Sequence, residues 1–151
     1  MLQGAYNITL HHYFQTYPTD PVLDALREPY YSAEFKTIAN ASATWAVDKF
    51  SSTLLVTRYG RTPNYASALT PLGYGNPGAG TVAPWILYNG SVSYEVTDNI
   101  RVSGIVNNIR NKKPPYDSSY FAYPYYNILD YNPYGRSYWL EVDWRFGRGG
   151  A

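Results

Sequence analysis

Apolar and polar residues alternate with a period of two in several stretches, most clearly in residues 135–146 near the end of the chain. One set of alternate positions there is apolar or aromatic throughout: Tyr138, Leu140, Val142, Trp144 and Phe146. The intervening set is polar at four of its five positions: Ser137, Trp139, Glu141, Asp143 and Arg145. Because successive side chains of a β-strand point to opposite faces, this pattern predicts a strand between an apolar and a wet environment.

The same periodicity predicts six strands along the chain. We expect them at residues 2–15, 35–47, 52–59, 84–96, 100–110 and 135–146. Long connections rich in Gly, Pro or Tyr alternate with tight turns at residues 48–51 and 97–99. The predicted fold class is therefore all-β, an antiparallel up-and-down meander of about six long strands. Long loops lie on one side of it and tight turns on the other.

Two architectures are compatible with this pattern. Long loops alternating with short turns are typical of outer-membrane barrels, and tilted strands of this length fit their apolar band. A soluble sandwich usually has shorter strands, with turns every 8–12 residues or so. Long loops without regular structure also argue against a compact soluble domain. The pattern therefore favours an arc of a transmembrane β-barrel, although six strands are fewer than the roughly eight with which closed barrels begin.

Composition narrows the function classes. The chain has 151 residues, a formal charge of +1, 18 tyrosines and no cysteine. The balanced charge gives no electrostatic footprint for nucleic acid, and without cysteine there is no disulfide or thiolate metal site. No apolar run is long enough for a transmembrane helix. The first residues lack the basic and apolar regions of a signal peptide, so an exported protein would need a start that is missing here.

Several segments near the end of the chain follow one another in a specific order. Residues 92–102 read as a strand, a tight turn and a strand, followed by Pro-Pro-Tyr-Asp at 114–117 and Tyr-Asn-Pro-Tyr-Gly-Arg at 131–136. The closing strand then ends in Phe146. In this order the chain resembles the C-terminal part of TonB-dependent outer-membrane receptors. The resemblance spans most of the chain, and before residue 35 it is only general.

The resemblance implies active transport of a scarce solute (a siderophore, a corrinoid or an oligosaccharide) across the outer membrane of a Gram-negative bacterium. Members of that family carry a plug domain inside a barrel of roughly 22 strands and draw energy through the TonB complex. Residues 1–146 would be the C-terminal strands of such a barrel, followed by a flexible tail at 147–151. The implied partners are outer-membrane lipid, the barrel-assembly machinery, the solute, and the TonB complex through the missing plug.

The final strand also resembles the signal by which the barrel-assembly machinery recognises its clients. That signal consists of aromatic and apolar residues at alternate positions, and the matching residues are Tyr138, Leu140, Val142, Trp144 and Phe146. In the family the phenylalanine is normally the last residue. Here residues 147–151 follow it, which is a departure from the family pattern.

The Tyr-rich loop at residues 116–134 is the best candidate for solute contact. Tyrosine rings stack on sugars or planar chelates and lose little conformational entropy on binding. The alternative is that the rings pack on one another and order the loop. The candidate solute contacts are Tyr116, Tyr120, Tyr123, Tyr125, Tyr126 and Tyr131.

Other polar residues favour structural roles. Glu141 and Asp143 share the polar face of the last strand. Two carboxylates on one face could form a catalytic pair, but we expect Arg101 and Arg145 to balance their charge instead. His11 and His12 are neighbours on a predicted strand, so they face opposite ways and cannot chelate one metal ion. Arg58 interrupts an apolar face and is expected at the outer rim. We find no catalytic set, phosphate loop or metal cluster, so we expect no enzyme, no metal and no cofactor.

Two other classes of protein remain open. One is a secreted Tyr/Trp-rich carbohydrate-binding β-domain, and the other is an outer-membrane barrel that serves as an enzyme or adhesin. The three hypotheses differ in what covers the apolar side of the strands. A structure in which Ile100, Leu140 and Val142 lie in a dry protein interior would contradict the membrane hypothesis.

Overall fold

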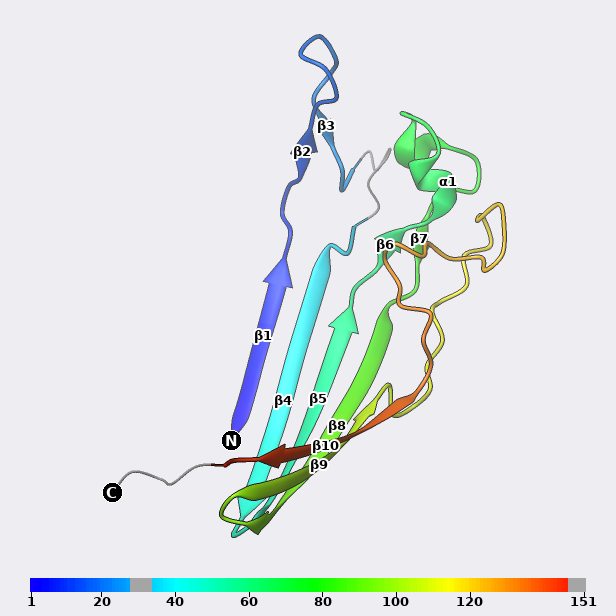
Figure 1. The fold of residues 1–151 in the computed structure, drawn as a ribbon. Helices are drawn as coiled ribbons and strands as arrows, with labels where there is room; N and C mark the ends of the chain where they lie inside the picture. The colour runs from blue at the N-terminus through cyan, green and yellow to red at the C-terminus, as the bar shows by residue number, and fades with distance from the viewer. Residues whose placement is uncertain (28–33, 147–151) are drawn as a thin grey trace.

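The computed structural model describes residues 1–27 and 34–146, and the predicted tail at 147–151 lies outside them. Six strands form one antiparallel sheet in which every neighbour in space is also the next long strand in the chain (Figure 1). The predicted all-β meander is therefore confirmed, and its described strands do not close into a barrel. The strands are β1 (Leu2–Ile8), β4 (Thr37–Val47), β5 (Phe50–Tyr59), β8 (Trp85–Thr97), β9 (Ile100–Asn107) and β10 (Ser137–Trp144).

The two ends of the sheet are built differently. At one end the strands are joined by two-residue turns, and Asp48 adopts a left-handed φ of 51° in the first of them. The long connections at the other end carry all the short elements (Figure 1). In the described residues no helix has the length and apolarity that crossing a membrane requires. The short elements are β2 (Tyr13–Phe14), β3 (Leu23–Asp24), β6 (Thr62–Pro63), α1 (Tyr65–Ala68), η1 (Gly73–Gly75) and β7 (Thr81–Val82).

The prediction of one strand over residues 2–15 was wrong, because β1 ends at Ile8. Ile8 pairs with Thr37, the first residue of β4, so the chain beyond it has no strand to pair with. The Thr9 amide instead donates to the Lys36 carbonyl at 2.9 Å. Residues 13 and 14 form the separate strand β2, which pairs with β3. The prediction failed because apolar and polar residues still alternate in the sequence after Ile8, although β4 offers no residue there to pair with.

Most other predicted strand boundaries move by one to three residues, as in the strands now at Thr37–Val47, Trp85–Thr97 and Ser137–Trp144. The strand expected to reach residue 110 stops at Asn107, because Asn108 has a φ of 50° and its side-chain amide bonds both the N–H and the carbonyl of Lys112. The turn expected at residues 48–51 is shorter. Phe50 already pairs with Val47, so residues 50 and 51 belong to β5.

The register assembles one continuous apolar face across all six strands. Most of its large side chains are exposed, because no second layer of the described protein covers them. Arg58 is a polar member of this face and lies near the loop end of β5, and its expected place at the outer rim of a membrane barrel stays a prediction. The apolar members are Leu2, Tyr6, Ile8, Ala39, Ala41, Ala43, Trp45, Val47, Phe50, Leu54, Val56, Ile86, Tyr88, Val92, Tyr94, Ile100, Val102, Val106, Tyr138, Leu140, Val142 and Trp144.

The opposite face of the same strands is rich in Ser, Thr and Asn. Neighbouring strands are joined there through hydroxyl pairs, Thr44 with Thr53 at 3.0 Å and Ser93 with Ser103 at 2.9 Å. Charged residues gather at its short-turn end, where Glu95 pairs with Arg101. The predicted separation into an apolar and a polar face is therefore confirmed. We call these the apolar face and the polar face below.

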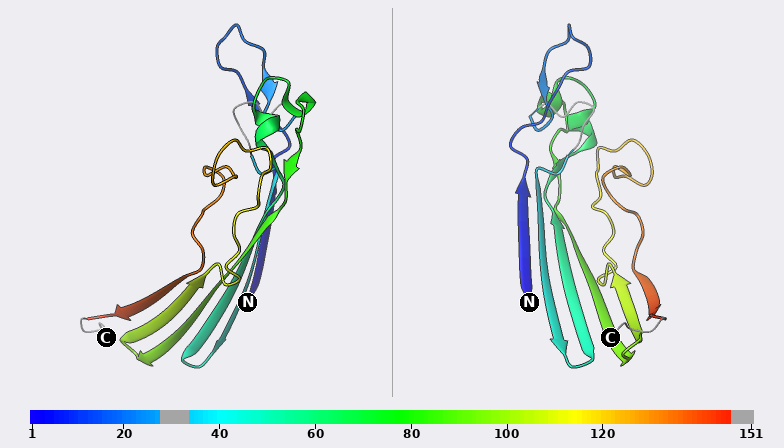
Figure 2. Two further views of the ribbon diagram at one scale, coloured as in Figure 1. Left: turned by 90° about the vertical axis from the view of Figure 1, so that its right-hand side faces the viewer. Right: turned by 60° about the vertical axis from the view of Figure 1, so that its left-hand side comes forward.

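The protein core lies at the loop end, on the side of the polar face. Trp85 is buried there, and its ring lies 5.7 Å from that of Tyr59 and 5.5 Å from that of Tyr131. Phe35 contacts both of those tyrosines, and Tyr126 contacts Tyr131 edge-on. These five residues form the loop-end cluster. The sheet itself is a single twisted layer, with β10 at a steep angle to β1 (Figure 2).

Candidate functional site

Two long connections meet above the loop-end cluster. The connection at residues 60–84 supplies α1, and the connection at residues 108–136 lies against it. Asp117 Oδ2 accepts from the Tyr65 N–H at 2.8 Å, and Ser119 Oγ accepts from the Ala66 N–H at 3.0 Å. These main-chain N–H groups are free in the first turn of a helix, so the second loop satisfies them and is fixed by them.

Asn64 organises the first loop. Its Oδ1 accepts from the Ser67 N–H, the Ser67 hydroxyl and the Gly80 N–H at 2.7–3.1 Å, and its Nδ2 donates to the Gly78 carbonyl at 2.9 Å. The side chain therefore caps α1 and ties the helix to the strand that leads back into the sheet. A short loop segment with so many internal bonds provides a fixed wall for the site.

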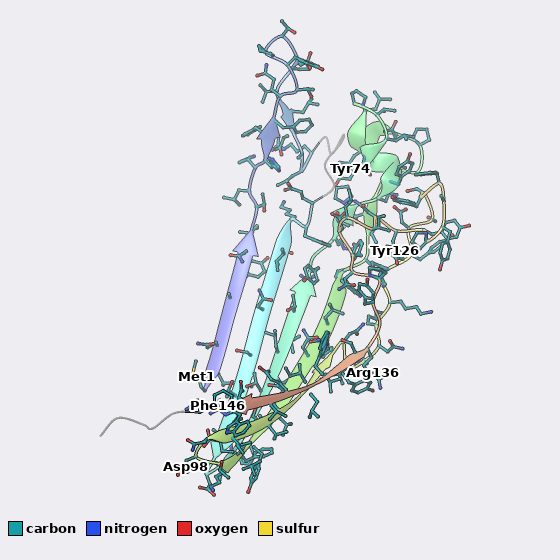
Figure 3. All side chains as sticks on the ribbon, in the orientation of Figure 1. Met1, Tyr74, Asp98, Tyr126, Arg136 and Phe146 are labelled. Atoms are coloured by element: carbon teal, nitrogen blue, oxygen red, sulfur yellow. The ribbon has the colours of Figure 1, made fainter. Side chains whose placement is uncertain are left out.

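A cavity of about 210 Å³ lies between the two loops. Figure 3 labels one of its residues, Tyr126, in the loops far from the short-turn end marked by Asp98. Its walls combine aromatic rings with neutral and acidic polar groups. The side chains that matter chemically are Tyr65, Tyr120, Tyr126, Tyr131, Thr62, Asn64, Asp117 and Asn127.

Two residues that line this cavity carry a buried hydroxyl that has no partner within the described protein. Thr62 and Tyr131 are each only 2% exposed, and neither Thr62 Oγ1 nor the Tyr131 hydroxyl makes a hydrogen bond there. A buried polar group without a partner costs about 1–3 kcal/mol, so two at one cavity call for a physical reason. Burial also raises the pKa of Tyr131, helped by Asp130 and Asp117, so its hydroxyl keeps its proton.

Asp130 is bonded to Asn127, a residue of the same cavity wall. Burial raises the pKa of Asp130 to about 6, partly opposed by a hydrogen bond from Asn127 and reinforced by the charge of Glu34. The Asn127 Nδ2 donates to Asp130 Oδ2 at 2.8 Å, and Asn127 lines the cavity. Asp130 is therefore hydrogen-bonded to a side chain that lines the cavity.

A second, wider hollow of about 550 Å³ lies below the loop at residues 108–136, against the polar face. Trp85 and Trp139 line it together with several asparagines. The Trp85 Nε1 is buried and makes no hydrogen bond to the described residues. Because Trp85 contacts Tyr131, these two rings stand between the hollow and the smaller cavity.

The six candidate tyrosines divide into two groups. Tyr120, Tyr126 and Tyr131 line the cavity. The others, Tyr116, Tyr123 and Tyr125, contact one another outside it. Sequence reasoning missed the members of the first loop, above all Thr62, Asn64 and Tyr65, and also Asp117 and Asn127. The only local signal was the Asn64-to-Ser67 capping spacing, which marks a helix start and does not reveal a site.

The five residues matched to the assembly signal have a common environment. Four of them, Tyr138, Leu140, Val142 and Trp144, belong to the apolar face of β10, and Phe146 follows Trp144, with ring centroids 4.8 Å apart. All five are exposed. The outer edge of β10 has no neighbour in the described sheet, so both its side chains and its backbone edge are accessible.

The charged residues make local pairs. Asp143 lies opposite Arg101 in the register, whereas Glu141 lies opposite Ser103. His11 contacts Asp24 at 3.3 Å, and His12 contacts Glu34. The part of the chain that the structure describes brings together no group of three or more potential metal ligands among His, Cys, Asp and Glu.

Comparison with protein-family models, with curated proteins and with solved structures finds no significant match to this chain.

Proposed function

We propose that this chain is a segment of an outer-membrane β-barrel that takes up a solute, of the kind formed by TonB-dependent receptors. The six-stranded sheet would be an arc of that barrel, with the apolar face toward lipid and the polar face toward the lumen. The long loops would face the outside of a Gram-negative cell and the tight turns its periplasm. The function would be transport without catalysis.

The observation that carries this proposal is the exposed apolar face. It extends over all six strands, while the loops and the core gather on the polar side. Contiguous apolar patches of more than a few hundred Å² are rare on soluble monomers and mark interaction or membrane surfaces. A soluble sandwich would cover this face with a second sheet. Lipid tails would cover the apolar face without a second sheet.

The aromatic residues of the apolar face support the proposal through their spacing. On β8 and on β10 the pairs Tyr88/Tyr94 and Tyr138/Trp144 are each six residues apart, which is about 20 Å along a strand. Tyr6 lies opposite Ala39, which precedes Trp45 by the same six residues. Two rows of aromatic rings therefore flank an aliphatic band, as in the girdles of membrane barrels.

The two rows also shift in register from strand to strand. From Tyr6 to Tyr138 the upper row moves four residues toward the turn end over five strand-to-strand steps, and from Trp45 to Trp144 the lower row moves four residues over four steps. With about 3.3 Å per residue and about 4.8 Å between strands, rows parallel to a membrane correspond to a strand tilt of roughly 30–35°. Outer-membrane strands tilt by about 35–45°.

The proposal also accounts for the two free edges. Unpaired edges promote association in water, and membrane barrels remove them by closure. In a receptor, β1 and β10 would pair with further strands of the same barrel, and β10 would carry the signal for the barrel-assembly machinery. Energy would come from the TonB complex through a plug domain. A coding sequence upstream of this chain that contains a plug would support the transport role against an adhesin or enzyme barrel.

A secreted carbohydrate-binding domain is the second candidate, because the tyrosine-lined cavity would serve it equally well. The exposed apolar face does not fit that function. Such a domain would be a monodisperse monomer in buffer without detergent, whereas a membrane segment requires lipid or detergent.

Two tryptophans of β10 provide a direct test. Trp139 and Trp144 lie five positions apart on opposite faces, and their exposed fractions are nearly equal, 64% and 63%. Variants with a single tryptophan, the other three being replaced by Phe, would be folded into phosphatidylcholine vesicles. Lipids brominated near the interface are expected to quench the fluorescence of Trp144 and to leave Trp139 unaffected.

The single-Trp45 variant serves as a second reporter of the apolar face and is expected to behave like Trp144. Equal quenching of Trp139 and Trp144 would contradict a sheet with one face toward lipid. A chain that stays monomeric in buffer and does not bind the vesicles would exclude the membrane role.

A further inference from the structure

The cavity between the two long loops has no assigned ligand, and its chemistry is specific enough to infer one. We propose that it binds a neutral polyhydroxylated ring, such as one sugar unit of an oligosaccharide. This inference takes its biological role from the proposed transport function, but the binding chemistry stands on the cavity alone.

The size of the cavity sets the first limit. At about 210 Å³ it is smaller than the roughly 300–1,000 Å³ of sites for drug-sized ligands, so it accepts one ring-sized group rather than a whole macrocycle. It lies at the loop end of the sheet, between loops that are fixed to each other by the Asp117 and Ser119 bonds. A cavity with fixed walls loses little entropy when a ligand enters.

The charges around the cavity limit the charge of the ligand that it can bind. Among the described residues that line it, Asp117 is the only charged side chain, so these residues offer no positive charge to an anionic chelate or a phosphate. The Asp117 carboxylate already accepts from the Tyr65 N–H and from the N–H and hydroxyl of Ser119. These donors offset its charge locally, which reduces its attraction for a cation.

The two hydroxyls without a hydrogen-bond partner are the evidence for a hydroxylated ligand. Thr62 and Tyr131 each bury a group that can both donate and accept, and neither has a partner among the described residues. An apolar ligand would leave both groups unpaired. A polyhydroxylated ligand offers partners to both once the buried oxygens turn toward the cavity that their residues line, and its apolar ring face packs on tyrosine rings such as Tyr65 and Tyr120. That combination favours a sugar over an apolar, anionic or cationic ligand.

The experiment is calorimetric titration of the full chain in micelles of a zwitterionic detergent, because detergents with sugar headgroups would compete. The titrants are maltotriose, xylotriose and galactotriose, with tetramethylammonium and an anionic ferric chelate as probes of the other two ligand classes. We expect saturable binding of at least one trisaccharide. Binding of the ammonium or the chelate without any trisaccharide would overturn the inference.

Two isosteric variants test the orphaned hydroxyls. Thr62→Val and Tyr131→Phe each remove one unpartnered group without changing the shape of the cavity. In the ligand-free protein they are expected to leave stability equal or higher, because an unsatisfied buried group is lost. Each is expected to weaken trisaccharide binding about tenfold, the worth of one hydrogen bond.

Tyr123→Phe is the matched control, since Tyr123 belongs to the same loop, is 85% exposed and lies outside the cavity. It is expected to bind like the unaltered chain. Trisaccharide affinity that neither Thr62→Val nor Tyr131→Phe changes would reject this cavity as the site. Calorimetry measures only ligand binding, and lipid quenching measures only membrane position. Failure of one proposal can therefore be distinguished from failure of the other.

Discussion

The chain uses the same aromatic residue types in two opposite environments. On the apolar face Trp45, Tyr94 and Trp144 lie on an uncovered sheet and are exposed. At the loop end Trp85 and Tyr131 are buried in a cluster with Phe35, Tyr59 and Tyr126, made by loops that fold back over the polar side. Composition alone therefore does not tell which tryptophan or tyrosine is a core residue.

The difference follows from the neighbours of each ring. A ring on the apolar face has sheet neighbours beside it and nothing above it in the described protein. A ring in the loop-end cluster has contacts from residues far apart in the sequence. The first kind gains the hydrophobic energy of burial only when an apolar medium such as lipid or detergent covers it, whereas the second gains it in water as well. The two sets of residues should therefore respond differently to mutation and to the surrounding medium.

The largest expected effect comes from removing the centre of the loop-end cluster. Trp85→Ala leaves a cavity beneath Tyr59 and Tyr131 and should lower the free energy of unfolding by about 3–5 kcal/mol. Trp144→Ala removes an exposed ring and its edge-on contact with Phe146, so about 0.5–1.5 kcal/mol is expected. Urea unfolding of both variants in the same micelles, followed by circular dichroism, gives the two values. A loss for Trp85→Ala no larger than about 1.5 kcal/mol would mean that the loop-end cluster is not a packed core.

The second effect tests the medium that covers the apolar face. Leu140 is 78% exposed near the middle of the aliphatic band of β10. If lipid covers it, Leu140→Arg should cost about 2–4 kcal/mol of folding free energy in bilayers. On a water-covered surface the same change would stay within about 0.5 kcal/mol.

The neighbouring residue provides the control for this measurement. Glu141→Arg introduces the same side chain one position along, on the polar face opposite Ser103, and should have little effect on folding. Urea titration of vesicle-folded protein measures both variants. A cost for Glu141→Arg as large as that for Leu140→Arg would show that the two faces are not in different media.

The strands were predictable because period two is a local signal. In β10 the alternation extends over the whole strand, and the register confirms the face of every residue from Ser137 to Trp144. The end of β1 was not predictable in this way. Alternation continues past Ile8, but pairing stops because β4 begins at Thr37, and that limit is set by a strand distant in the sequence.

The candidate site was only partly predictable for the same reason. The density of tyrosine in residues 116–134 indicated the second loop, and three of those tyrosines line the cavity. The first loop contributes Thr62 and Tyr65 through contacts such as the Tyr65–Asp117 bond, which joins residues 52 positions apart. No periodicity or spacing in the sequence encodes such a contact. A buried hydroxyl without a partner likewise becomes visible only in three dimensions.

The smallest expected effect concerns the pH dependence of the loop-end region. Burial raises the pKa of Asp130 to about 6, above its ordinary value of 3.8. Between these two values the folded loop holds a proton that the unfolded loop has released. The folded loop is therefore favoured most below about pH 4, and this contribution is lost as the pH rises to 6 and above. Nothing comparable is expected on the uncovered rings of the apolar face.

Amide hydrogen exchange at residues 126–131, corrected for the intrinsic pH dependence of exchange, would measure this change. Protection there should decrease from pH 4.5 to pH 7 in the unaltered chain. Asp130→Asn keeps a side-chain oxygen that can accept from Asn127 but cannot titrate in this range, so its protection should be nearly flat. If the variant retains the full slope, another group controls the loop. A matching slope in the strand amides of β10 would mean that the two regions respond to pH together, and that the loop-end region is not an independent unit.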